Sequence, residues 1–135
     1  MTRKAKIGLI GCSTVVGLLF LFWCLVVVAS NGTLGNNAYI NLFLVRSAFQ
    51  NATSDDFRQA QIEVSDTPRE LSAAELTRFL SRKVQSTHPA DPWGGDLQIT
   101  IWKRASGGGS FCAGRVTSCV AKNLWGRDIR STEEF

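Results

Sequence analysis

The sequence predicts an α+β protein, in which a single N-terminal transmembrane helix is followed by a small extracytoplasmic domain of helices plus an antiparallel β-meander. Three observations lead to this prediction. Residues 7–29 form an uncharged apolar stretch, residues 72–85 repeat apolar side chains at helical spacing, and residues 96–104 and 111–121 alternate side chains as strands do. The 135 residues leave room for one modest domain besides the anchor.

The apolar stretch at residues 7–29 is long enough to span a membrane. Its 23 residues would extend about 35 Å as a helix, and a hydrocarbon core is ~30 Å thick. Arg3, Lys4 and Lys6 precede it without any acidic residue, which predicts that residues 1–6 stay in the cytoplasm. A cleaved signal peptide is the alternative, but its apolar region usually runs only about 7–15 residues. We therefore expect a retained single-pass signal-anchor, with residues 30–135 outside.

Residues 30–70 are expected to form a linker and a membrane-proximal helical segment. The stretch SNGTLGNN at 30–37 contains two glycines and three asparagines, which is typical of a hinge or turn. Residues 38–52 are strongly apolar but too few for a second span. A helix at the membrane surface, or one buried against partner subunits, fits them best. Residues 53–68 are polar and predict an irregular path, with a helical continuation as the alternative.

Residues 72–85 carry the clearest signal for a helix outside the membrane. Ser72 and Glu75 match a capping box. The apolar stripe that follows consists of Leu76, Phe79, Leu80 and Val84.

The segment 88–95, HPADPWGG, predicts a packed corner between that helix and the first strand. Asp91, Pro92, Trp93 and Gly94 have the residue types of a tight turn. Trp93 is expected to pack over the neighbouring sheet, and its alternative role is a recognition residue. His88 is the only histidine, so it has no second imidazole with which to build a zinc site.

The four cysteines divide into two pairs. Cys12 and Cys24 lie within the span, whereas Cys112 and Cys119 lie in the exterior part. An oxidising compartment favours a disulfide between Cys112 and Cys119, and a pair of reduced thiols is the alternative.

The turn DPWG at 91–94, placed between a helix and a meander, resembles the type II secretion pseudopilins and related type IV pilin-like proteins. The resemblance covers about residues 71–135 and implies a pilin-like α+β head there. The C-terminal loop of that family can bind calcium, so the resemblance implies Asp128, Glu133 and Glu134 as calcium ligands, with a solvated acidic tail as the alternative. The prepilin processing signal is absent, because the span contains no acidic residue.

Charge and motif content exclude several classes of function. Three of the 15 Lys and Arg residues precede the span, which leaves 12 against 11 acids outside it. This near-neutral exterior has no basic run, so nucleic-acid binding is not expected. No catalytic constellation and no small-molecule substrate are evident. Apart from calcium, no cofactor is expected.

The first functional hypothesis is a non-enzymatic structural component of a secretion, filament or envelope assembly in the bacterial inner membrane. Its N-terminus would be cytoplasmic, its head periplasmic, and its partners membrane lipids and other membrane-protein subunits. The second is an accessory subunit of a large energy-converting or light-harvesting complex, which the missing processing signal favours. The third is an extracytoplasmic enzyme or redox protein, which no motif supports.

Overall fold

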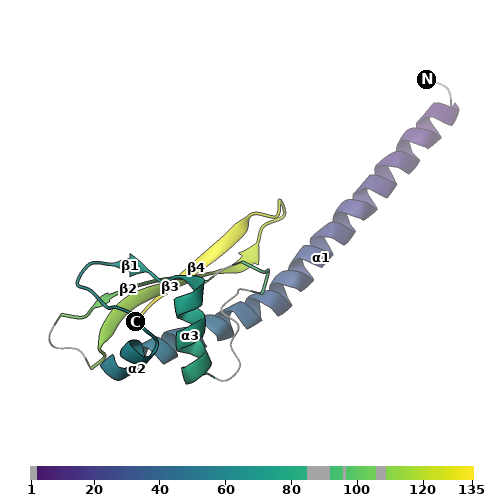
Figure 1. Ribbon diagram of the computed structural model, residues 1–135. Coiled ribbons are helices and arrows are strands. Elements are labelled where there is room, and N and C mark those ends of the chain that lie inside the picture. The colour runs from purple at the N-terminus through teal and green to yellow at the C-terminus, as the bar shows by residue number, and fades with distance from the viewer. Residues whose placement is uncertain (1–2, 85–91, 96, 106–108) are drawn as a thin grey trace.

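The computed structural model describes residues 3–84, 92–95, 97–105 and 109–135. One long helix, α1 (Arg3–Gln50, 48 residues), runs through the molecule. Figure 1 shows that its N-terminal part projects alone, whereas its C-terminal part lies against a sheet and two shorter helices. The expected α+β organisation is confirmed.

The hinge expected at residues 30–37 is wrong, because α1 continues through this segment without interruption. Glycine and asparagine cost only about 0.5–1 kcal/mol each in helix propensity, and tertiary contacts override a penalty of that size. Two of these residues make such contacts. Asn31 bonds to the backbone of residue 122, and Gly35 lies directly against the carbonyl of Val120. Residues that resemble a linker in the sequence are therefore contact residues within a helix.

The two parts of α1 have different surroundings. From Ser13 onward, α1 contains an exposed apolar stretch, so α1 is long and apolar enough to cross a membrane. Farther along, α1 buries one stripe of side chains at helical spacing. These are Ala38, Leu42, Val45 and Phe49. The helix thus serves as an apolar rod at one end and as part of a protein core at the other.

Two short helices cover the end of α1. Helix α2 (Ser54–Gln59) begins at a capping box made by Thr53 and Asp56. Helix α3 (Ala73–Lys83) begins at the expected capping box of Ser72 and Glu75, and it buries the expected stripe at Leu76, Phe79 and Leu80. An ion pair of 2.7 Å between Lys83 Nζ and an Asp56 carboxylate oxygen joins the two helices.

The sheet is an antiparallel meander with strand order β1-β2-β3-β4. Its strands are β1 (Arg69–Glu70), β2 (Gln98–Lys103), β3 (Cys112–Lys122) and β4 (Asp128–Glu134). Strands β2 and β3 fall where alternation predicts them. Strand β4 lies in the acidic C-terminal tail, and its sequence DIRSTEE has only one large apolar side chain. Pairing with β3 holds it extended despite this composition.

The core lies between the C-terminal part of α1 and the inner face of the sheet. Ile99, Ile101 and Val116 contribute from the strands and are completely buried. Aromatic rings fill the end nearest α2 and α3: Phe49 stacks on Phe79 at 4.3 Å and on Phe135 at 5.4 Å between centroids. Residue 114 must be glycine here, because a Cβ atom would lie 2.5 Å from the Phe135 ring.

Candidate functional site

The junction between α1 and the β3–β4 hairpin is the most specific contact between the apolar helix and the head. The Asn31 side-chain amide donates to the Lys122 carbonyl at 2.7 Å, and its oxygen accepts from the Lys122 backbone N–H at 2.8 Å. The amide thereby satisfies both backbone groups of one strand residue, as a neighbouring strand would. This pairing fixes the register of the helix along the end of β3.

Two further contacts hold the junction on either side of Asn31. Toward the N-terminus, the Trp23 indole Nε1 donates to the Leu124 carbonyl at 3.1 Å. Toward the C-terminus, a Cβ atom on Gly35 would lie 2.7 Å from the Val120 carbonyl oxygen, so only glycine permits this approach. The β3–β4 hairpin therefore contacts α1 from residue 35 back to residue 23.

A shallow cavity of ≈ 170 Å³ lies at this junction. It is lined by Trp23, Val26, Val27, Ser30, Asn31, Trp93, Lys122, Asn123 and Gly126. Small-molecule sites usually enclose about 300–1,000 Å³. The cavity is thus better suited to an apolar side chain or an acyl chain than to a cofactor.

The residues of the predicted corner lie partly inside the described structure. Pro92 and Trp93 form a turn and Gly94 has φ +83°, whereas Asp91 and His88 lie outside the described residues. Trp93 is half-buried, packs against the edge of the core and lines the junction cavity. It therefore connects the corner to α1 as well as to the sheet.

A second surface lies on the outer side of α1, beyond the junction. Tyr39, Ile40 and Phe43 leave 54%, 49% and 67% of their surface exposed. Beside them, an Arg46 guanidinium nitrogen bonds to Glu133 of β4 at 3.0 Å. A cavity of ≈ 210 Å³ separates this ion pair from the aromatic rings. We call Tyr39, Ile40 and Phe43 the apolar flank of α1.

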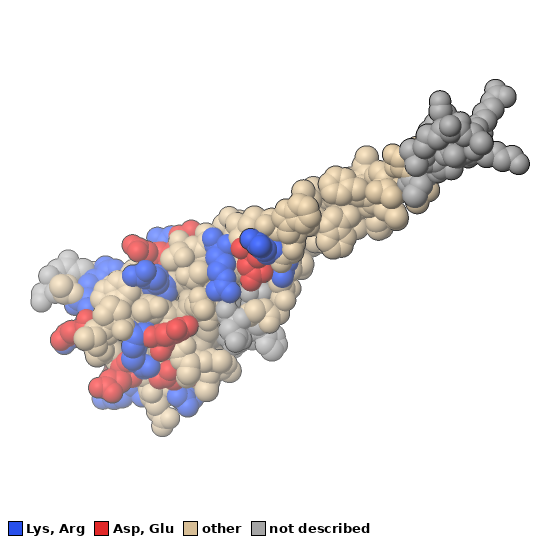
Figure 2. Space-filling view, turned by 90° about the horizontal axis from the view of Figure 1, so that it is seen from above, with Lys and Arg blue, Asp and Glu red and all other residues tan. Residues whose placement is uncertain are grey.

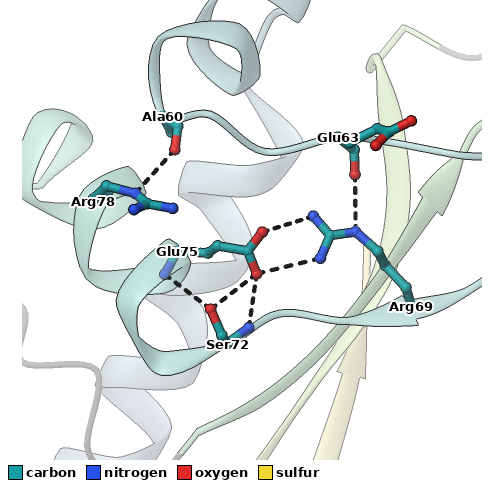
Figure 3. A network of polar contacts seen from close by, with 6 residues as sticks. All are labelled: Ala60, Glu63, Arg69, Ser72, Glu75 and Arg78. Atoms are coloured by element: carbon teal, nitrogen blue, oxygen red, sulfur yellow. Dashed lines mark hydrogen bonds and ion pairs between the residues drawn. The ribbon is translucent and has the colours of Figure 1, made fainter.

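A polar network locks α3 to the segment that precedes it, as Figure 3 shows. The Arg69 guanidinium donates to both carboxylate oxygens of Glu75, at 2.9 and 3.3 Å, and its Nε donates to the Glu63 carbonyl. These hydrogen bonds from Arg69, together with those from Ser72, lower the pKa of Glu75 to about 2. Every polar atom aimed at Glu75 thus stabilises its charged form, which indicates a structural role.

The disulfide expected between Cys112 and Cys119 does not form in this structure, because the two cysteines lie apart on the same strand. Seven steps along a strand cover roughly 20 Å or more at ~3.3 Å per residue. A disulfide needs Cα atoms less than about 7 Å apart. Burial raises the pKa of the Cys112 thiol to about 11, so it stays protonated, whereas the Cys119 thiol donates to the Ala121 carbonyl.

The three carboxylates proposed as calcium ligands are not brought together. Asp128 pairs with Lys122 at 3.2 Å, and this contact lowers the pKa of its carboxyl group. Glu133 bonds to Arg46 of α1, and alternation along β4 directs it away from the face that carries Asp128 and Glu134. Within the described residues, no three metal-ligating side chains converge on one point.

Charged side chains of both signs are interspersed over the head in the view of Figure 2, whereas the projecting part of α1 shows none up to its grey tip. This face therefore offers no single-sign patch of the kind that binds nucleic acid.

Sequence reasoning missed the junction. It assigned Asn31 and Gly35 to a linker and gave Trp23 no partner in the head. A local signal existed, since both an asparagine and a glycine follow an apolar helix directly, but the same residues are common in turns. Comparison with protein-family models, with curated proteins and with solved structures gave no match.

Proposed function

We propose that this chain is a non-enzymatic, single-pass membrane protein and a structural component of a secretion, filament or envelope assembly. Its pseudopilin-like head would stand on the periplasmic side of the bacterial inner membrane. The observation that carries the proposal is the continuity of α1. This one helix forms both the exposed apolar segment and part of the hydrophobic core of the head.

Continuity supports a structural role because it fixes the direction of the head relative to the membrane. A hinge would let the head swivel independently of its anchor. Here the contacts of Trp23, Asn31 and Gly35 also hold the hairpin against the rod on the membrane side of the core. Subunits that pack side by side in an ordered assembly need such a fixed geometry.

The apolar flank supports contact with other subunits. Tyr39, Ile40 and Phe43 lie ten residues or more beyond the end of the expected span, so lipid tails would not cover them. Exposed aromatic and aliphatic side chains on one helix face are typical of protein interfaces. We therefore assign the flank to a neighbouring helix of the assembly.

The proposal is tested by mild detergent extraction from the native membrane, followed by native gel separation and mass spectrometry. The wild-type chain should migrate in a high-mass species together with other envelope subunits. Phe43→Lys should shift the chain to a lower-mass band, because it places a charge in the flank. Ala74→Lys, on an exposed position of α3, is the matched control and should leave the high-mass band unchanged.

A wild-type chain that migrates alone in mild detergent would contradict the proposal. The second candidate is an accessory subunit of an energy-converting or light-harvesting complex, and the absence of an acidic residue from the span favours it. The co-migrating proteins distinguish the two candidates. Secretion or pilus components would support the first, and respiratory or photosynthetic subunits the second.

A further inference from the structure

We propose that the tip of the β3–β4 hairpin, residues 123–127, is a second membrane contact that inserts beside α1 at the boundary between the lipid headgroups and the acyl chains. The inserted side chains would be Leu124 and Trp125. This inference rests on the membrane anchoring contained in the proposed function and adds to it a lipid-binding site in the head itself.

The position of the tip along α1 is the first argument. The Leu124 carbonyl is bonded to Trp23, which lies six residues before the last apolar residue of the expected span, Ala29. Six residues of helix cover about 9 Å, so the tip lies about 9 Å on the membrane side of Ala29. The apolar stretch is about 35 Å long and the hydrocarbon core is ~30 Å thick, so a stretch centred in the bilayer holds the tip just inside the boundary between headgroups and acyl chains.

The side chains at the tip are the second argument. Trp125 is 84% exposed and Leu124 is 42% exposed, although both are large and apolar. Tryptophan is enriched where membrane meets water, because its ring is apolar and its N–H is polar. Trp102 provides the contrast within the same sheet, since it is only partly exposed and lies under the Arg115 guanidinium at 5.8 Å.

Several backbone groups of the tip are already hydrogen-bonded within the protein, which lowers the free-energy cost of burying them in a poorly hydrated layer. The Asn123 side-chain oxygen accepts from the N–H groups of Trp125 and Arg127, both at 2.9 Å. The Asn123 carbonyl accepts from Gly126, and the Leu124 carbonyl accepts from Trp23. Gly126 adopts φ +75°, which lets the turn close within so few residues.

The charges around the tip fit an anionic headgroup layer. Lys122, Arg127 and Arg130 supply three cations against the single carboxylate of Asp128, which leaves a local charge of +2. Lys122 and Arg130 share Asp128, whereas the exposed Arg127 guanidinium forms no ion pair with any described residue. Arg127 is thus available for a lipid phosphate, and basic residues near a membrane surface contribute about 1 kcal/mol each in anionic lipid.

The experiment uses the full-length chain in lipid vesicles, with and without bromine on the acyl chains, and measures quenching of tryptophan fluorescence. The chain contains four tryptophans, and we expect Trp23 and Trp125 to supply most of the quenched signal. Trp125→Phe should therefore remove roughly half of the quenched amplitude, as an interfacial Trp would. Trp102→Phe, on β2 and away from the tip, is the matched control and should leave the quenched amplitude unchanged.

Each outcome has a distinct meaning. If Trp125→Phe leaves the quenched amplitude as it is in wild type while Trp23→Phe lowers it, α1 is inserted but the tip stays in water or contacts a protein, and the inference is overturned. If wild-type fluorescence is not quenched at all, α1 itself is not inserted, and the proposed membrane anchoring fails with it. Circular dichroism of each variant checks that the head remains folded.

Discussion

At the scale of single residues, Glu75 shows how one carboxylate can connect three segments of the head. Glu75 lies in the first turn of α3, and its carboxylate accepts hydrogen bonds from Arg69 of β1 and from the backbone N–H and hydroxyl of Ser72 between them. Its pKa of about 2 lies below its ordinary value of 4.5. A lowered folded-state pKa means that its stabilisation is fully present above pH 4.5 and disappears as the pH falls toward 2.

Glu75→Gln should therefore lower the free energy of unfolding at pH 7, by about 1–3 kcal/mol given 1.36 kcal/mol per pKa unit. The difference between variant and wild type should shrink steadily as the pH is lowered from 5 to 2.5, roughly the interval between the two pKa values. Urea unfolding of the detergent-solubilised chain, followed by circular dichroism across this pH range, measures it.

Glu70→Gln is the matched control for that experiment. Glu70 lies on the neighbouring strand β1, is exposed and forms no ion pair with the described residues. Its substitution should change the stability by less than about 0.5 kcal/mol at any pH. Equal effects of the two substitutions would show that the network around Glu75 adds nothing to the fold.

Sequence reasoning at this scale succeeded where the partner was local. The Ser72–Glu75 capping box needs only a spacing of three residues, and it forms as expected. The disulfide failed because it depended on the path of the chain between Cys112 and Cys119. Their spacing fits a hairpin loop, but pairing with β2 and β4 keeps the whole segment extended.

At the scale of elements, the close approach of α1 to β3 depends on Gly35. Gly35→Ala would place a methyl group 2.7 Å from the Val120 carbonyl, a backbone atom that cannot move aside without shifting the strand. We expect a loss of about 1–2 kcal/mol in unfolding free energy, the cost of overpacking reduced by the better helix propensity of alanine.

Gly32→Ala is the control within the same helix, because a Cβ atom at residue 32 meets nothing within 4 Å. It should stabilise the helix by about 0.5–1 kcal/mol. Chemical unfolding of both variants in the same detergent compares them directly. If both substitutions stabilised the protein, the helix and strand would not be in the close contact described.

Prediction of elements worked for amphipathic segments and failed for those that tertiary contacts define. In helix α3 and strands β2 and β3, the spacing of apolar residues in the sequence identifies the buried face. In strand β4 it does not, because most of its side chains are exposed or only partly covered. The prediction of a hinge at residues 30–37 was also wrong. Their composition is typical of a turn, but contacts with a strand some 90 residues away keep them helical.

At the scale of the whole molecule, the continuity of α1 through residues 30–37 fixes the orientation of the head relative to the N-terminal apolar part of the helix. Proline at residue 33 would remove one helical hydrogen bond and clash with the preceding turn, at a cost of about 3 kcal/mol. Thr33 is exposed, so the substitution disturbs no buried side chain.

Thr33→Pro should therefore raise the amide hydrogen exchange of residues 30–37 strongly, while leaving the protection of β2 and β3 close to wild type. Thr33→Ala is the control and should keep the segment protected. Hydrogen–deuterium exchange with mass spectrometry in lipid nanodiscs provides the measurement. Rapid exchange of residues 30–37 in the wild-type chain would contradict a continuous helix and restore the hinge.

Because α1 supplies part of the core of the head, some core residues are synthesised well before the strands that cover them. Leu42, Val45 and Phe49 precede every strand in the chain, so they leave the ribosome before the residues that will cover them exist. In the proposed topology, these side chains would lie uncovered next to the membrane during export, until the last strand has been synthesised. The interval is a window for aggregation, and a translocation chaperone or the bilayer surface itself must shield them until the sheet closes.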